Sequence, residues 1–314
     1  MDKRVDHLTT LIKELVKRGS GRITYGFIDR ELDITTPAEK TLRRVVFKDL
    51  CDAGEIRREE HLTGVYWIID REAPEIDWQG ADPKNVINLK FPLGLERYVK
   101  IFPKSIIIIA GEKEACKTLW LYTFTLLNMY HPLGIDLYNS ETGKEQMRER
   151  LDNFNFVIPE PAPFRVKERY DNFADVINPN KISVIDYLDL SSEVYEVGEE
   201  IDKIFRKLKG GIAVIGLQVP PPTKQLYRGQ EKWVHRDLAY GGGFTAKRAI
   251  LYLTLWSTGR KTKLLKIKYC KTRADPQVDP NNMQWTFSVN NNGTAFVNPQ
   301  RSGELDFGED EANA

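Results

Sequence analysis

The chain has 314 residues, of which 46 are lysine or arginine, 45 are aspartate or glutamate and three are cysteine. This composition, 41% hydrophobic, is that of a globular protein with one large domain or a large and a small one, and it excludes a disordered or fibrous chain. Because the formal net charge is only +1, any contact with nucleic acid must depend on local basic patches.

The cysteines and the apolar runs indicate the compartment. Cys51, Cys116 and Cys270 form no Cys-x-x-Cys pair, so neither a disulfide framework nor a structural zinc site is expected. The longest apolar run, residues 106–110, is far shorter than the roughly 20 residues that cross a membrane, and the N-terminal residues lack the apolar stretch of a signal peptide. We expect a soluble, cytoplasmic protein with no membrane partner.

The first predicted element is a helix over residues 5–18, where apolar residues recur with helical spacing before Gly19. A short segment over residues 25–32 follows. Thr36 and Glu39 then provide the capping box of a further helix.

A β-hairpin is predicted next, over residues 56–70, because aromatic and β-branched residues flank a polar turn at Thr63 and Gly64. Three helices followed by a hairpin are typical of a small winged helix-turn-helix domain, which we assign to residues 1–72. Residues 73–88 combine proline, glycine and acids without periodicity, as a linker does.

Basic side chains on the third predicted helix and on the hairpin are of the kind that contact DNA phosphates and groove edges. They are Lys40, Arg43, Arg44, Lys48, Arg57 and Arg58. We expect Arg43 and Arg44 to contact duplex DNA. The alternative is a protein-docking module whose surface cations serve solubility.

Residues 89–300 alternate continuous apolar runs with amphipathic helices. This pattern predicts an α/β domain with a mostly parallel sheet and helices on both of its faces. The acidic tail, residues 301–314, has little to bury and is expected to be a disordered, solvated end, with a partner-binding acidic tip as the alternative.

The strongest motif follows the first apolar strand of this domain. The segment from Gly111 through Lys117 and Thr118 reads as G-x-x-x-x-G-K-[ST] except at Cys116, and it has a strand before it and a helix after it. In such a P-loop, backbone N–H groups hold phosphates, the lysine reaches the β- and γ-phosphates, and the hydroxyl binds Mg²⁺. The candidate ATP-binding residues are Gly111, Glu112, Lys113, Glu114, Ala115, Cys116, Lys117, Thr118 and Leu119.

Cys116 replaces the second glycine of the motif. A side chain at this position raises the steric demand where the backbone approaches a phosphate. A reactive cysteine is the other interpretation, but no His or Asp in the sequence can be assigned to Cys116 as its base.

Two acids follow later strands of the same domain. Asp186 ends an apolar strand, where a Walker B carboxylate holds magnesium, so Thr118 and Asp186 are the candidate metal ligands. Glu141 follows another strand and is a candidate to orient the water that attacks the γ-phosphate. An acid favoured by the helix dipole is the alternative for Glu141.

From residue 89 to about residue 289 these motifs resemble, in order, those of the RecA-like ATPases and, within them, the DnaB-type replicative helicases. The motifs are IIIIAGEKEACKT, LYNSETGKEQMRERL, SVIDYLDL, GIAVIGLQ, RDLAYGGGFTAKRAILYLTL and KIKYCKTRADPQVDPNNMQWTFSV. The resemblance implies a RecA-like fold, Gln218 as a γ-phosphate sensor, and Lys271 and Arg273 as cations that reach a neighbouring subunit's nucleotide. The winged-helix-like N-terminal domain and Cys116 depart from the family's pattern.

Lys271 and Arg273 also lie two residues apart on a predicted strand, so that both would face one side of the sheet. Surface cations that protect an edge strand are the alternative. Residues 219–243 are predicted to form a long unstructured loop in which cations alternate with aromatic residues, as in sites for single-stranded nucleic acid. Its candidate contacts are Lys224, Arg228, Lys232 and Arg236.

The leading hypothesis from the sequence is an ATP- and Mg²⁺-dependent motor, a helicase or translocase of replication or of a mobile element. It would assemble as a hexameric ring on single-stranded DNA and contact duplex DNA through its N-terminal domain. The alternative is an ATP-gated DNA-binding regulator or initiator with little or no unwinding activity. A catalytically silent scaffold, suggested only by Cys116, is the third hypothesis.

Overall fold

The computed structural model describes most of the chain in two units, Met1–Ala81 and Asp82–Ala314. The described residues are 3–19, 21–71, 73, 75–188, 196–227, 230–258 and 262–302, and for residues 3–6, 225–227, 230–233 and 302 the backbone alone is described. The boundary between the units lies inside the predicted linker. Ile87, from the end of that linker, is buried in the core of the second unit. The predicted acidic tail lies outside the described residues, apart from its first two positions.

The first unit contains three helices and a small antiparallel sheet of strand order β1–β3–β2. Its elements are α1 (Lys3–Arg18), β1 (Arg22–Thr24), α2 (Tyr25–Glu31), α3 (Pro37–Asp52), β2 (Ile56–Arg58) and β3 (Val65–Ile68). The helices and the hairpin occur where the sequence predicts them. Strand β1 was not predicted, because three residues are too few to show a period of two.

Helix α3 begins with the predicted capping box. The Glu39 backbone N–H donates to Thr36 Oγ1 (3.3 Å), and the Thr36 N–H donates to Glu39 Oε2 (3.1 Å). Val46, Phe47 and Leu50 of this helix are buried and form part of the core of the unit. The helix therefore has a start that is fixed locally and a face that is fixed by packing.

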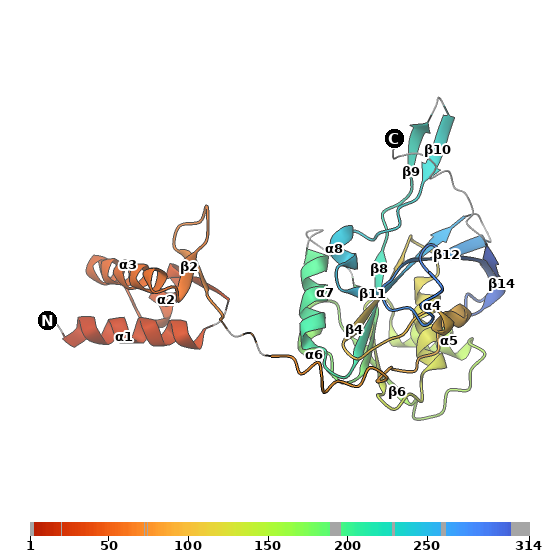
Figure 1. Ribbon diagram of the computed structural model, residues 1–314, viewed down its shortest axis with the longest axis horizontal. Helices are drawn as coiled ribbons and strands as arrows, with labels where there is room; N and C mark the ends of the chain where they lie inside the picture. The colour runs from red at the N-terminus through yellow and green to blue at the C-terminus, as the bar shows by residue number, and fades with distance from the viewer. Residues whose placement is uncertain are drawn as a thin grey trace. The chain divides into compact units, whose positions relative to one another are not determined.

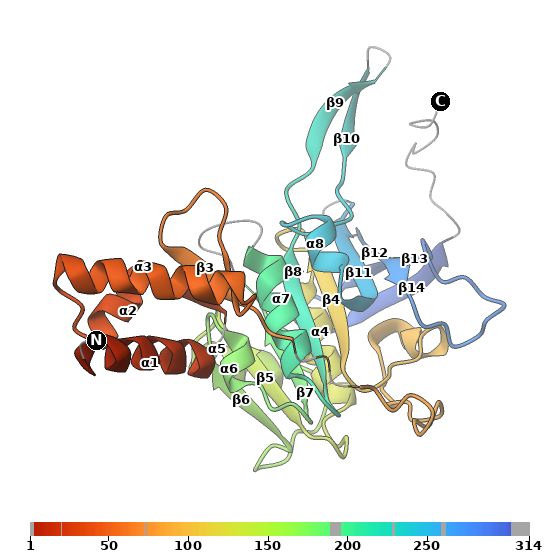
Figure 2. The same cartoon turned by 60° about the vertical axis from the view of Figure 1, so that its left-hand side comes forward.

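The second unit is built on a nine-stranded sheet of order β14–β13–β12–β11–β4–β8–β7–β5–β6. The strands are β4 (Ser105–Gly111), β5 (Ile135–Asn139), β6 (Phe164–Glu168), β7 (Ile182–Asp186), β8 (Ile212–Gln218), β11 (Ala249–Ser257), β12 (Thr262–Cys270), β13 (Gln284–Val289) and β14 (Phe296–Ser302). The six strands from β11 to β6 run parallel, whereas β12, β13 and β14 are antiparallel additions (Figure 2).

Helices cover both faces of this sheet (Figure 1). They are α4 (Lys117–Leu127) and α5 (Lys144–Asp152) on one face and α6 (Phe173–Val176), α7 (Glu196–Lys207) and α8 (Gly243–Ala246) on the other, with a 3₁₀ turn, η1 (Pro92–Arg97), before β4. Ile107 belongs to the same core cluster as Trp120 of α4, and Ile108 to that of Ile201 of α7. Both faces of β4 are buried, which explains its continuous apolar run and confirms the predicted fold class. In the described part of the chain, no helix combines the length and apolarity needed to cross a membrane.

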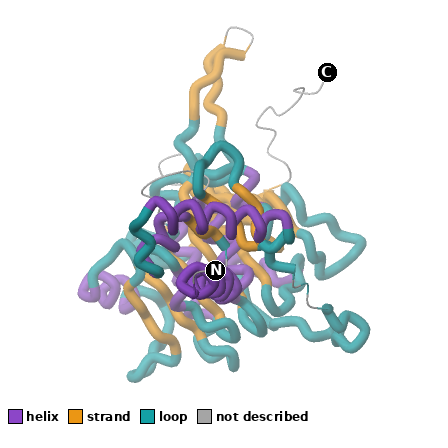
Figure 3. Tube along the Cα trace, turned by 90° about the vertical axis from the view of Figure 1, so that its left-hand side faces the viewer, coloured by secondary structure: helices purple, strands orange, loops and turns teal. Residues whose placement is uncertain are grey.

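A separate hairpin extends from the end of β8. It consists of β9 (Thr223–Tyr227) and β10 (Gln230–Val234), which pair only with each other among the described strands. Loop segments join it to the sheet, as Figure 3 shows in teal. The prediction of an unstructured loop over residues 219–243 was therefore wrong in its centre, where β-branched and aromatic residues support strand pairing.

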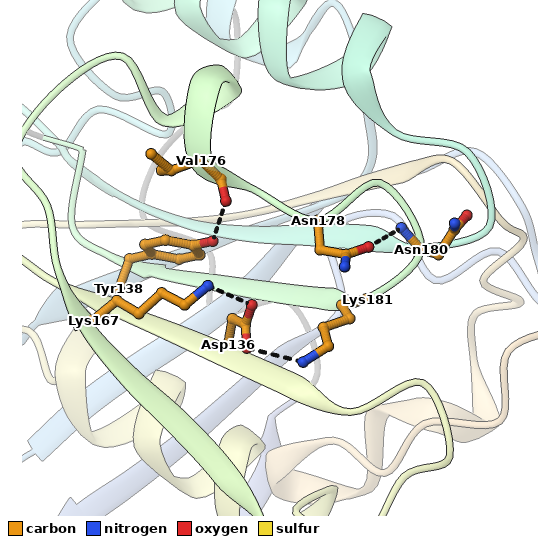
Figure 4. Close-up of polar contacts among 7 residues, drawn as sticks. All are labelled: Asp136, Tyr138, Lys167, Val176, Asn178, Asn180 and Lys181. Carbon is orange, nitrogen blue, oxygen red and sulfur yellow. Dashed lines mark hydrogen bonds and ion pairs between the residues drawn. The ribbon is translucent and has the colours of Figure 1, made fainter.

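A buried carboxylate ties β5, β6 and the start of β7 together (Figure 4). Asp136 is 2% exposed and accepts hydrogen bonds from Lys167 Nζ (2.7 Å) and Lys181 Nζ (3.2 Å). Beside it, Tyr138 Oη donates to the Val176 carbonyl (3.1 Å). Burial alone would raise the pKa of Asp136, but the two ammonium groups outweigh it and lower that pKa below its ordinary 3.8.

Candidate functional site

The carboxyl ends of the central parallel strands meet at one edge of the sheet and bring separate motifs together. Gly111 at the end of β4 pairs with Gln218 at the end of β8. Strand β7, next to β8, ends at Asp186, and Glu141 follows the neighbouring β5. Ligand sites of open α/β sheets lie at this edge. The structure thus places the predicted loop, sensor and acids at a single edge.

The loop after β4 is held by Lys117. Its Nζ donates to the carbonyl oxygens of Gly111 and Glu112, both at 3.0 Å. A Cβ at Gly111 would lie 2.9 Å from Lys117 Cγ and 3.1 Å from Leu255 Cβ, so only glycine leaves room for the lysine stem here. Burial lowers the pKa of Lys117. A buried ammonium whose acceptors are backbone carbonyls is well suited to exchange them for an anionic ligand.

Cys116 adopts a left-handed backbone conformation, with φ 72° and ψ 28°. For a residue with a Cβ this region costs about 1–2 kcal/mol relative to the right-handed region, whereas glycine enters it freely. The steric demand expected at this position is therefore present. Burial raises the pKa of the Cys116 thiol, which is the opposite of what an activated nucleophile requires.

Beneath the loop, Thr118 Oγ1 donates to Asp186 Oδ1 at 3.2 Å. Asp186 is 2% exposed, and burial, followed by the nearby charge of Glu141, raises its pKa from 3.8 to about 7. A hydroxyl beside a desolvated carboxylate fits a small divalent cation that prefers oxygen ligands. No cluster of three or more metal-binding His, Cys, Asp or Glu side chains exists in the described residues, so such a cation would share its ligands with a bound phosphate or water.

The turn after β5 fixes the position of Glu141. Asn139 Oδ1 accepts the backbone N–H groups of Glu141 (3.4 Å) and Thr142 (3.3 Å). Ser140 Oγ donates to the Tyr187 carbonyl at 3.0 Å, which joins the ends of β5 and β7. The Glu141 side chain is exposed and its charge acts on Asp186, so it lies near the buried carboxylate and in reach of water.

Two cations near the loop were not predicted. The charge of Arg150, on α5, lowers the pKa of both Asp186 and Cys116, and its guanidinium lies 5.4 Å from the Tyr122 ring centroid. Lys263, at the start of β12, donates to the Glu114 carbonyl at 3.0 Å. Arg150 follows Glu141 on the next helix, a signal that the sequence did contain. The approach of Lys263 depends on the pairing of β11 with β12 and has no sequence signal.

Lys271 and Arg273 lie at the opposite edge of the sheet from the loop, because β12 runs antiparallel to β11. They do not share a strand as predicted, since β12 ends at Cys270. Lys271 Nζ donates to the Lys247 carbonyl (3.1 Å), and Arg273 forms an ion pair with Asp279 (2.8 Å). Within one chain these cations do not approach the loop, and a role at a neighbour's site remains a prediction.

A cavity of about 880 Å³ lies at the base of the hairpin β9–β10. Its lining includes Arg236 together with Tyr240, Phe244 and Tyr269, whose side chains are 41%, 64% and 38% exposed. Of the other predicted nucleic-acid contacts, Lys224 is exposed on β9, whereas Arg228 and the side chain of Lys232 lie outside the described residues.

In the first unit, the prediction that Arg43 contacts DNA was wrong. Its guanidinium pairs with the Asp29 carboxylate, lies 3.9 Å from the Tyr25 ring centroid, and leaves Arg43 only 4% exposed. A buried, paired arginine is not available to a phosphate. Arg44 is exposed on α3, as are Lys40 and Lys48 on its preceding and following turns.

No protein-family model and no curated protein matches this chain. Among solved structures, the ATPase domain of a DnaB helicase superposes with a TM-score of 0.48 at 14% identity, over 69% of this chain and 93% of that one. The KaiC-like protein PH0186 from Pyrococcus horikoshii OT3 gives a TM-score of 0.47 at 13% identity, over 70% of this chain and 100% of that one. These values assign no role to any residue.

Proposed function

We propose that the second unit is a RecA-like ATPase that acts as a motor on single-stranded DNA. The observation that carries the proposal is the convergence of three groups at one sheet edge: the Lys117 ammonium on the loop carbonyls, and the Thr118 hydroxyl against the buried Asp186 carboxylate. These are the groups that bind a triphosphate and its metal ion.

In the proposed reaction, ATP phosphates accept hydrogen bonds from the loop N–H groups at the start of α4, and Lys117 moves from its carbonyls to the β- and γ-phosphates. Thr118 and Asp186 would hold Mg²⁺, which supplies charge compensation on the phosphate oxygens. Glu141 orients the attacking water and accepts its proton. The water oxygen bonds to the γ-phosphorus as the bond to the β–γ bridging oxygen breaks, and ADP and phosphate leave.

The hairpin base is the proposed contact for the nucleic acid. Tyr240, Phe244 and Tyr269 expose ring surface around a single cavity, with Arg236 and Lys268 in its lining. Aromatic faces stack with bases irrespective of sequence, and the cations bind the phosphates between them. Assembly as a hexameric ring, with Lys271 and Arg273 presented to the next copy, is part of the same proposal.

The test is steady-state ATP hydrolysis by the full chain, with and without single-stranded DNA. Lys117→Ala should abolish turnover, while Lys207→Ala, an exposed lysine at the end of α7, serves as the matched control. Undiminished hydrolysis by Lys117→Ala would refute the site. Nucleotide binding without DNA-stimulated turnover would favour the regulator described next.

A second candidate function is an ATP-gated, duplex-binding regulator. It is favoured by the exposed cations of α3, where Lys40, Arg44 and Lys48 lie on successive turns. Because Arg43 is buried, the informative variant is Arg44→Ala with Lys48→Ala. Loss of duplex affinity with unchanged ATPase activity would support this function, and unchanged affinity would leave α3 as a docking or solvated surface.

A further inference from the structure

The side chain of Glu112, the residue after Gly111, points away from the loop and contacts the hairpin base. Its Oε1 lies 2.7 Å from Nδ1 of His235, the residue that follows β10. Glu112 is only 7% exposed. A loop carboxylate that is buried and hydrogen-bonded by a residue distant in sequence fixes two segments to each other.

Both ends of the hairpin segment are attached to the same two residues of the loop. At its start, the Val219 backbone N–H donates to the Gly111 carbonyl at 2.9 Å. At its end, His235 binds the Glu112 side chain. The entry to the hairpin and the exit from it therefore both depend on the position of Gly111 and Glu112.

Lys117 acts on these two residues as well. Its ammonium donates to the carbonyl oxygens of Gly111 and Glu112, and the Gly111 carbonyl also accepts the Val219 N–H. A phosphate that attracts Lys117 removes a charged donor from both carbonyls. The hydrogen bonds from Val219 and His235 then still hold the loop to the hairpin segment, so a shift of the loop moves that segment with it.

Beyond His235 the chain is fixed to the sheet. Trp256 Nε1 donates to the Arg236 carbonyl (3.0 Å), and Thr254 Oγ1 donates to the Asp237 carbonyl (2.7 Å). The Asp237 carboxylate pairs with Lys268 and with the buried Lys266. Because residues 236 and 237 are held in this way, a shift at His235 is transmitted to β10 rather than absorbed downstream.

We infer that His235 is a positioning residue that couples occupancy of the nucleotide loop to the hairpin β9–β10, through its hydrogen bond to Glu112. The inference rests on the proposed function, because it requires the loop to bind a nucleotide. It adds to that function a specific route from the nucleotide to the nucleic-acid contact.

The experiment measures two quantities in the full chain. The first is the Kd for a non-hydrolysable ATP analogue. The second is hydrogen–deuterium exchange of the amides of residues 219–243 with and without the analogue. In the wild type, the analogue should change exchange in this segment. His235→Ala should keep the Kd within about threefold and lose the response, since typical coupling between sites is about 5–150-fold.

Conservative and control variants separate coupling from folding. His235→Gln, which keeps a donor for Glu112, should restore part of the response, and Glu112→Gln should weaken it. His131→Ala, a histidine between α4 and β5, is the matched control and should respond as the wild type does. Thermal unfolding of each variant verifies that it is folded.

The outcomes distinguish the inference from the function. If the wild type binds no nucleotide, the proposed function fails in the first measurement and the inference fails with it. If the wild type binds and responds, and folded His235→Ala responds equally, His235 is not the coupling residue while the nucleotide site stands.

Discussion

Two carboxylates of the same sheet, Asp136 on β5 and Asp186 on β7, are equally buried at 2% exposure but are compensated differently. Asp136 has two lysine ammonium groups, and its pKa is lowered. Asp186 has the Thr118 hydroxyl, and its pKa is raised to about 7. A buried charge with its counterions in place stabilises a fold, whereas one without them is suited to a cation that arrives with a ligand.

The largest expected effect of breaking this comparison is on turnover. Asp186→Asn should lower ATP hydrolysis by at least about 100-fold, the scale on which a lost electrostatic contact to a transition state is felt. It should not lower the free energy of unfolding, because the amide can still accept the Thr118 hydrogen bond and a buried charge is removed. Hydrolysis assays and urea unfolding at pH 8 check the two halves, and a large loss of stability would contradict the contrast.

The reciprocal change is Asp136→Asn. It leaves two lysines without their carboxylate, so the free energy of unfolding should fall by about 2 kcal/mol, less than for a fully buried pair because both ammonium groups reach solvent. Asp152→Asn, which breaks the exposed ion pair with Arg148, is the matched control and should cost at most about 0.5 kcal/mol. If both variants unfold at the same urea concentration, Asp136 contributes no more than a surface pair does.

Acid pH should sharpen the comparison. Because the pKa of Asp136 is lowered on folding, its stabilising contribution is fully present above its ordinary pKa of 3.8 and is lost as the pH falls through the folded-state value. Urea unfolding between pH 6 and pH 3 should show a smaller loss of stability in Asp136→Asn than in the wild type. Parallel curves for the two proteins would show that Asp136 is not part of the acid transition.

The smallest expected effect concerns the loop itself. Cys116→Gly removes a Cβ from a residue at φ 72° and should stabilise the fold by up to about 1 kcal/mol, partly offset by the greater freedom of glycine in the unfolded chain. Cys116→Ala is the matched control, since it removes the thiol but keeps the strained Cβ. An equal gain from both variants would assign the effect to the thiol instead of the backbone.

Sequence reasoning succeeded where neighbouring residues carry the information. The capping box of Thr36 and Glu39, the buried strand before Gly111, and the acid at the end of β7 were all predicted from short segments. It failed for Arg43 and for the hairpin β9–β10. Arg43 has the composition of a surface helix residue, and only the approach of Asp29 and Tyr25 shows that it is buried.

The sequence by itself therefore determined the order of helices and strands, the parallel sheet and the candidate nucleotide loop, because periodicity, caps and turn residues act over a few positions. Only the tertiary structure decided which buried acid has its counterions, and that Glu112 contacts His235. Such contacts join residues far apart in the chain, and their energies depend on burial and distance, which no local pattern encodes.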